Sequence, residues 1–153
     1  MATRYKGSPR EQRALAAYIN LMRASNTIHS QATKHLDEHG LTPSQFAVLE
    51  ALYHIGPMCL GDLARKILRT SGNLTMVVDN LQKSGLVKRI PGAMDRRFVS
   101  VEVTEKGRTL ISGIFPEHAA EIAKLMSRLS AEEQERLREL CRKLGKDEEA
   151  VEK

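Results

Sequence analysis

The stretch SGNLTMVVDNLQKSGLVKRIPGAMDRRFVSVEVTEKG, residues 71–107, decides the fold of this 153-residue chain. Its first part has apolar residues at i, i+3, i+4 and i+7, the spacing of a helix with one apolar face: Leu74, Val77, Val78 and Leu81. Gly85 follows where a glycine commonly ends a helix. The apolar period then changes, which predicts two strands, 86–90 and 98–103, around a loop at 91–97. The stretch therefore predicts a helix followed by a two-stranded hairpin.

Two further helices are predicted just before this stretch. Residues 42–45, Thr-Pro-Ser-Gln, supply a helix cap, a proline at the first helical position and the glutamine of a capping box. Gly56 and Pro57 end that helix, a short strand is expected at Met58-Cys59, and a second helix is expected over 60–68. The helix over 60–68 and the helix that begins at residue 71 are joined by a tight turn, and such a pair presents its second helix, the recognition helix, outward so that it can enter the DNA major groove. Residues 42–103 are therefore predicted to form a winged helix-turn-helix DNA-binding domain.

Long helical patterns lie on both sides of this domain. The region 10–41 is expected to hold one helix to about residue 38, and Gly40 ends it. The region 104–146 begins with a long helix capped by Thr104, and Ser130 opens a last helix. A proline inside the long helix, Pro116, is expected to kink it. The predicted fold class is mainly α with a small β wing.

The two ends of the chain lack a helical pattern. Residues 1–9 are expected to be a disordered tail, and residues 147–153 a charged tail. The polar, basic start does not resemble a secretory signal, and no apolar run reaches the ~18–20 residues of a membrane span. Two cysteines are too few to indicate a disulfide scaffold. We therefore expect a cytoplasmic protein.

The charge distribution points to a polyanionic partner. The chain has 24 Lys and Arg against 19 Asp and Glu, a formal net charge of +5. Residues 60–108 hold 10 basic and 5 acidic side chains, so the basic excess lies in the middle third. A local basic excess is typical of proteins that bind nucleic acid. Aromatic residues make up only 4%, without Trp, which argues against a stacking platform for single strands.

No residue pattern indicates catalysis, a cofactor or a metal. The sequence lacks Gly-x-Ser-x-Gly, a P-loop, His-Glu-x-x-His and Cys-x-x-Cys, so an enzyme is not expected. His35 and His39 are four residues apart, a spacing at which two histidines on one helix face can bind the same metal ion. The favoured interpretation is that both are solvated histidines near a helix end. Cys59 and Cys141 are both expected to be buried and inert, with Cys59 the better candidate for a redox sensor.

The centre of the chain resembles the MarR family of winged-helix transcription regulators. The resemblance is carried by residues 71–89, by Asp95-Arg96-Arg97 and by the Thr-x-x-Gly at 104–107, and it extends over nearly all of 10–146. Residues 74–91 and 114–118 are most similar to the MhqR-like subgroup, repressors that respond to quinones and related phenolic compounds. The resemblance implies that Arg97 probes the minor groove, that Asp95 holds the wing by pairing with an arginine, and that Arg96 contacts a phosphate.

The resemblance also implies a homodimer built from the regions 10–41 and 104–146. The long apolar stripes agree, because a small winged domain cannot cover them. The residues expected to form the dimer contact are Leu15, Tyr18, Ile19, Ile122, Met126, Leu137, Leu140 and Leu144. A two-fold dimer places two recognition helices ~34 Å apart, which predicts a palindromic DNA operator.

The sequence therefore favours a dimeric, sequence-specific DNA-binding repressor that a small aromatic or phenolic ligand, or a redox signal, releases from its operator. An interaction module that binds protein or RNA without an operator is the alternative. The expected DNA-binding residues are Ser71, Gly72, Asn73, Thr75, Met76, Lys83, Arg89, Asp95, Arg96 and Arg97. An effector pocket is expected where the helical region meets the winged domain. Its candidate lining residues are Met22, Ile28, His29, Tyr53 and Phe115.

Overall fold

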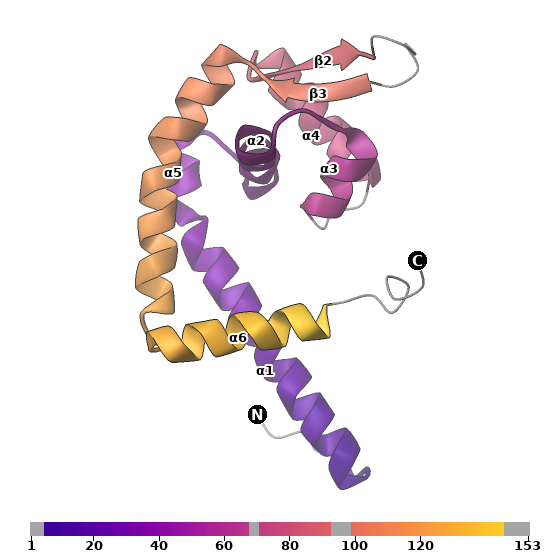
Figure 1. The fold of residues 1–153 in the computed structure, drawn as a ribbon, viewed down its shortest axis with the longest axis vertical. Helices are drawn as coiled ribbons and strands as arrows, with labels where there is room; N and C mark the ends of the chain where they lie inside the picture. Colours follow the sequence, from indigo (N-terminus) through magenta and orange to yellow (C-terminus); the bar gives the residue numbers. More distant parts are fainter. Residues whose placement is uncertain (1–4, 68–70, 93–98, 146–153) are drawn as a thin grey trace.

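The computed structural model describes residues 5–67, 71–92 and 99–145, and Figure 1 shows their arrangement. Helices predominate and one small sheet is present, so the predicted fold class is confirmed. The element order is α1 (Pro9–Ala32), the 3₁₀ helix η1 (Lys34–His39), α2 (Pro43–Ile55), β1 (Met58–Cys59), α3 (Leu60–Lys66), α4 (Ser71–Lys83), β2 (Val87–Pro91), β3 (Val99–Val103), α5 (Glu105–Met126) and α6 (Ala131–Leu144).

The first helical region differs from its prediction at both ends. Helix α1 begins at Pro9, inside the tail expected over 1–9, because Ser8 forms a capping box with Glu11. The expected single helix to residue 38 is instead α1 followed by η1. The break falls at Thr33, whose hydroxyl donates to the carbonyl of His29 at 2.8 Å, and the next turn closes through tighter i to i+3 bonds.

The sheet has three strands: the two predicted for the wing and the short strand predicted at Met58-Cys59. Strands β2 and β3 form the expected antiparallel hairpin, with Arg89 opposite Val101. The short strand β1 pairs on the other edge of β3, with Met58 opposite Val101, so the order is β1-β3-β2. This third strand ties the start of α3 to the wing.

The core of the winged domain is continuous with α5. Leu49, Leu63, Leu74 and Val101 from α2, α3, α4 and β3 are all fully buried, and Ile111 of α5 packs into the same cluster. Burial of one Leu or Ile side chain stabilises a fold by about 1.5–3 kcal/mol. The apolar cluster therefore fixes α4 relative to the other elements of the domain.

A close contact joins the start of α5 to the end of α4. Thr104 caps α5, and its hydroxyl donates to the carbonyl of Gly85 at 2.6 Å. The ammonium group of Lys106 donates to the Ser84 carbonyl at 2.8 Å. Gly107 lies against the backbone, because a Cβ there would be 2.1 Å from the Leu86 carbonyl oxygen. The Thr-x-x-Gly motif thus combines a helix cap with a close backbone approach.

Helices α1 and α6 extend away from the winged domain, and α5 connects the two parts (Figure 1). Ser130 forms its predicted capping box with Glu133 at the start of α6, yet no residue of α6 is buried. Among the described residues, no helix is both long and apolar enough to cross a membrane.

Candidate nucleic-acid interface

Helix α4 has one buried and one exposed face. Leu74, Val78 and Leu81 are 0–1% exposed, and they hold the helix on the core. Asn73 and Thr75 lie at the surface near the helix start, and Met76 is 60% exposed. Asn73, Thr75 and Met76, which the helical spacing predicts to face away from the core, therefore do so. Ser71 and Gly72 are the first two residues of the same helix.

Two basic residues, Lys83 of α4 and Arg89 of β2, lie near the C-terminal end of α4, and they differ in their surroundings. Lys83 is exposed in the last turn. Arg89 of β2 is instead tied to α4: its guanidinium lies 2.6 Å from the Asp79 carboxylate and donates to Gln82 at 2.6 Å. Sequence reasoning placed Arg89 on the positive surface but did not find these partners, because they depend on how β2 packs beside α4. Arg89 therefore holds the wing strand against the recognition helix.

The wing residues Asp95, Arg96 and Arg97 lie outside the described residues. The strands on either side are described, and Pro91 of β2 is paired with Val99 of β3. The described ends of β2 and β3 therefore lie next to each other.

The residues expected to form the dimer contact lie at the surface of the single chain. Tyr18 is 61% exposed, Leu140 49% and Leu144 72%. They line an apolar groove between α1 and α6, made of Ala14, Ala17, Tyr18, Leu21, Leu137, Leu140, Cys141 and Leu144. Ile122 is also exposed, while Leu15, Ile19, Met126 and Leu137 are half-buried.

The structure does not place the five candidate effector residues around one cavity of the single chain. Tyr53 and Phe115 pack against the core, and the Arg108 guanidinium lies 5.6 Å from the Tyr53 ring centre. Met22 and His29 are exposed on α1. Ile28 lines a separate groove between α1 and α5, with Arg23, Ala24, Thr27, Leu125, Met126, Arg128, Leu129 and Leu137.

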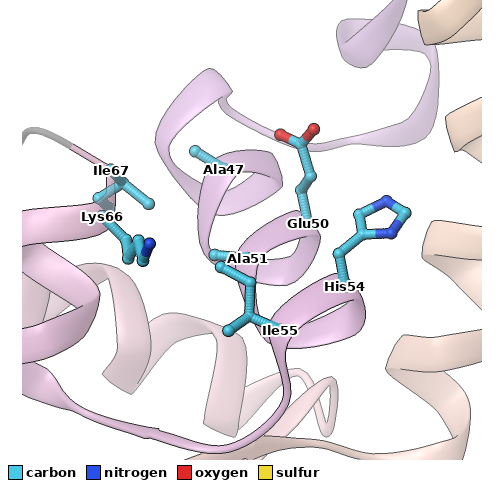
Figure 2. Close-up of a pocket in the computed structure, with 7 residues that line it drawn as sticks. All are labelled: Ala47, Glu50, Ala51, His54, Ile55, Lys66 and Ile67. Atoms are coloured by element: carbon cyan, nitrogen blue, oxygen red, sulfur yellow. The ribbon is translucent and has the colours of Figure 1, made fainter.

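Sequence reasoning missed a pocket between α2 and the end of α3. Figure 2 shows Lys66 and Ile67 on one side of the α2 residues and the side chains of Glu50 and His54 on the other. Ala47, Ala51 and Ile55 complete its lining. No motif indicates this pocket, because it arises where two helices pack.

Both cysteines are exposed, so the prediction that they are buried is wrong. Cys59 caps α3: its sulfur accepts from the Asp62 amide at 3.4 Å and its thiol donates to the Asp62 carboxylate at 3.1 Å. That hydrogen bond and the adjacent Arg65 lower the pKa of Asp62 below its ordinary value. Cys141 lies on the predicted apolar stripe, but this stripe lines the open groove between α1 and α6 and no residue of α6 is buried.

The interpretation of His35 as a solvated histidine is also wrong. His35 is 9% exposed, because η1 turns it inward beside Phe46, with ring centres 6.4 Å apart. His39 remains at the surface, where Nε2 lies 3.6 Å from the Glu117 carboxylate. In the described residues, no group of three or more His, Cys, Asp or Glu is arranged to hold a metal ion.

A helix-turn-helix with a polar exposed helix and a hairpin wing defines the class of winged-helix DNA-binding proteins. The sequence model of the MarR family matches residues 41–99. The HTH-type transcriptional regulator MhqR of Bacillus subtilis (strain 168) is 43% identical over 134 residues, which cover 88% of this chain and 92% of that protein. The chain belongs to the MarR family, whose members are transcription regulators.

Solved structures agree with this assignment. NadR in complex with 4-hydroxyphenylacetate has a TM-score of 0.76 and 26% identity, covering 97% of this chain and 100% of that one. The complex of S. aureus MepR with DNA has a TM-score of 0.71 and 25% identity, covering 84% and 94%. The similar proteins thus include one bound to a small aromatic acid and one bound to DNA.

Proposed function

We propose that the chain is a homodimeric repressor that binds a palindromic operator and is released by a small aromatic or phenolic ligand. The observation that carries this proposal is the two-faced helix α4. Leu74, Val78 and Leu81 are fully buried. Asn73, Thr75 and Met76 on the other side of the helix are exposed. A helix held rigidly in this way can enter the major groove with its polar side chains directed at base edges.

The exposed residues of α4 have the chemistry of base contacts. The Asn73 amide can donate and accept at one adenine, and the Met76 side chain suits a thymine methyl group. Amide groups at the start of α4, from Ser71 and Gly72, favour a phosphate. Lys83 adds a positive charge at the other end of the helix.

The wing supplies the remaining contacts of the proposal. Arg97 reaches the minor groove, where the negative potential favours an arginine, and Arg96 contacts a phosphate. Asp95 holds the loop in place by pairing with an arginine. These assignments rest on the family resemblance and on the hairpin that the flanking strands form.

A second copy of the chain covers the groove between α1 and α6. Its exposed apolar side chains, including Tyr18, Leu140 and Leu144, are too many for a surface in contact with water alone. A two-fold axis through this region presents both α4 helices on one side, ~34 Å apart. The operator is then a palindrome with half-sites one DNA turn apart.

The releasing ligand binds where α1 and α5 meet the winged domain. Met22, Ile28, His29, Tyr53 and Phe115 lie on the elements that meet there, and the partner subunit would complete the pocket. The similarity to NadR, solved with 4-hydroxyphenylacetate, supports an aromatic acid or phenol as the ligand. The ligand must bind more tightly to a dimer whose recognition helices do not fit the operator. A redox signal at exposed Cys59 is the other proposed trigger.

Titration of a protein–operator complex with salicylate-like and quinone-like compounds tests the release. We expect dissociation at up to millimolar ligand, and none at that concentration would reject a small-molecule effector.

A salt series separates the repressor from an interaction module. We expect binding to duplex DNA with a log–log salt slope of roughly −0.9 for each phosphate contacted. Binding of equal strength to structured RNA, or no binding to any duplex, would instead support a module without an operator. The assay is fluorescence anisotropy with a labelled duplex and a labelled hairpin RNA of matched length.

A further inference from the structure

Two histidines are buried without the hydrogen bonds that such groups normally have. His35 is 9% and His118 7% exposed. Among the described residues, neither ring nitrogen of His35 nor Nδ1 of His118 has a hydrogen-bond partner. The two rings are neighbours, tilted by 38° to each other, with centres 5.2 Å apart. Most buried polar groups in proteins are paired, so two neighbouring exceptions call for an explanation.

The histidine pair lies at the joint between the winged domain and the helical region. His35 belongs to η1, which follows α1, and His118 belongs to α5. Phe46 of α2 completes the cluster, with its ring centre 4.5 Å from that of His118. At the same contact between α2 and α5, the ring centres of His54 and Phe115 are 4.5 Å apart. Any change in the packing of this pair therefore acts on the elements that orient α4.

The charged groups around His118 do not compensate for the burial of a proton on its ring. Burial lowers the pKa of His118 below its ordinary value, and His35 and His29 lower it further. The Glu50 carboxylate and a hydrogen bond with the Ala32 backbone act in the opposite direction, without reversing the shift. His39 is engaged with Glu117 at the surface, 3.6 Å away. A proton taken up inside the packed joint is therefore unfavourable.

A metal does not account for the pair. In the parts of the chain that the structure describes, no set of three or more His, Cys, Asp or Glu is placed to bind one. Two imidazoles alone leave a typical zinc site short of protein ligands.

We propose that the buried His35–His118 pair makes operator binding sensitive to acid, so that proton uptake loosens this joint and weakens the hold on DNA. The proposal rests on the proposed function as a DNA-binding repressor. Because the folded pKa of His118 is lowered, the packed joint is fully stabilised above the ordinary histidine pKa of ~6.5. That stabilisation is lost as the pH falls from ~6.5 toward the lowered value. General electrostatics predicts the opposite sign, since added positive charge strengthens DNA binding.

The test compares three proteins on one operator duplex, by anisotropy at about pH 8 and about pH 5.5. The proteins are the wild type, His118→Phe, which keeps an aromatic ring without a titrating nitrogen, and His54→Gln, which removes an exposed histidine of the same region. We expect the wild type to lose at least about threefold in affinity relative to His118→Phe on acidification, a fraction of the tenfold that one unit of pKa difference allows. His54→Gln should behave as the wild type does. Equal pH dependence of the wild type and His118→Phe would overturn the proposal.

Two measurements without DNA keep the test independent of the proposed function. Urea unfolding at the same two pH values should show the wild type losing stability relative to His118→Phe. Should His118→Phe fail to fold, an NMR titration of the wild-type imidazole signals decides, because His118 must titrate below the ordinary pKa of histidine. A His118 that titrates with an ordinary histidine pKa refutes the inference. A protein whose stability falls on acidification as expected, but which binds no DNA duplex, refutes only the repressor function.

Discussion

At the scale of single residues, Asn73 carries the most specific claim. It lies exposed near the start of α4, one residue before the buried Leu74. Replacement of Asn73 by Ala should remove a base contact worth roughly 1–3 kcal/mol and change which base pair is preferred at one position of each half-site. Asn80→Ala, at an exposed site farther along α4, is the matched control. Competition binding with operators altered at single positions measures the preference, and an unchanged preference in Asn73→Ala would contradict base readout by this residue.

Asp95 and Arg97 carry opposite charges, yet replacement of either by Ala is expected to weaken DNA binding. Arg97→Ala should weaken binding to most sequences and flatten the salt dependence, because it removes a positive charge from the protein surface that contacts DNA. Asp95→Ala removes a negative charge and should nevertheless weaken binding, because its proposed role is to hold the wing. Anisotropy over a salt series measures both. Tighter operator binding by Asp95→Ala, with unchanged circular dichroism, would exclude the proposed role of Asp95.

The sequence predicted the exposure of single residues well where spacing alone decides it. Asn73 and Met76 are exposed because Leu74 and Val78 must face the core of the same helix. It failed for Cys141, which has an apolar spacing but lies exposed in the open groove between α1 and α6. The spacing identifies a face that is suited to burial, and only the tertiary or quaternary structure decides what covers it.

At the scale of elements, two glycines of α5 form a matched pair. A Cβ at Gly107 would be 2.1 Å from the Leu86 carbonyl oxygen, whereas one at Gly113 would meet nothing within 4 Å. Gly107→Ala should therefore destabilise the fold by about 1–3 kcal/mol through overpacking. Gly113→Ala should stabilise it by up to ~1 kcal/mol through helix propensity. Urea denaturation measures both, and equal effects of the two substitutions would contradict the close approach of α5 to the end of α4.

Local signals explain which elements the sequence could predict. The capping boxes at Thr42 and Ser130 involve residues three apart, and both form as expected. The short strand at Met58-Cys59 also forms as expected, but its pairing with Val101 was not predicted, because it joins residues that are distant in the chain. The inward turn of His35 likewise depends on a break at Thr33 that no glycine or proline marks.

At the scale of the whole molecule, the exposed groove of α1 and α6 predicts a dimer. Leu140→Glu places a charge in this groove and should forfeit about 1.5–3 kcal/mol of apolar burial in each subunit. Lys143→Glu changes the charge of α6 more but lies outside the groove lining, so it should leave the dimer intact. Sedimentation equilibrium distinguishes the monomer from the dimer for each variant. A dimeric Leu140→Glu protein of wild-type affinity would show that this groove is not the contact between subunits.

The central claim is that α4 and the wing of a two-fold dimer read a palindromic operator. Selection of bound fragments from a random pool of DNA duplexes tests it most directly. The account predicts enrichment of an inverted repeat whose half-site centres lie about one helical turn, ~10 base pairs, apart. Retention of fragments without any common sequence, or of a single half-site without its symmetric partner, would contradict it.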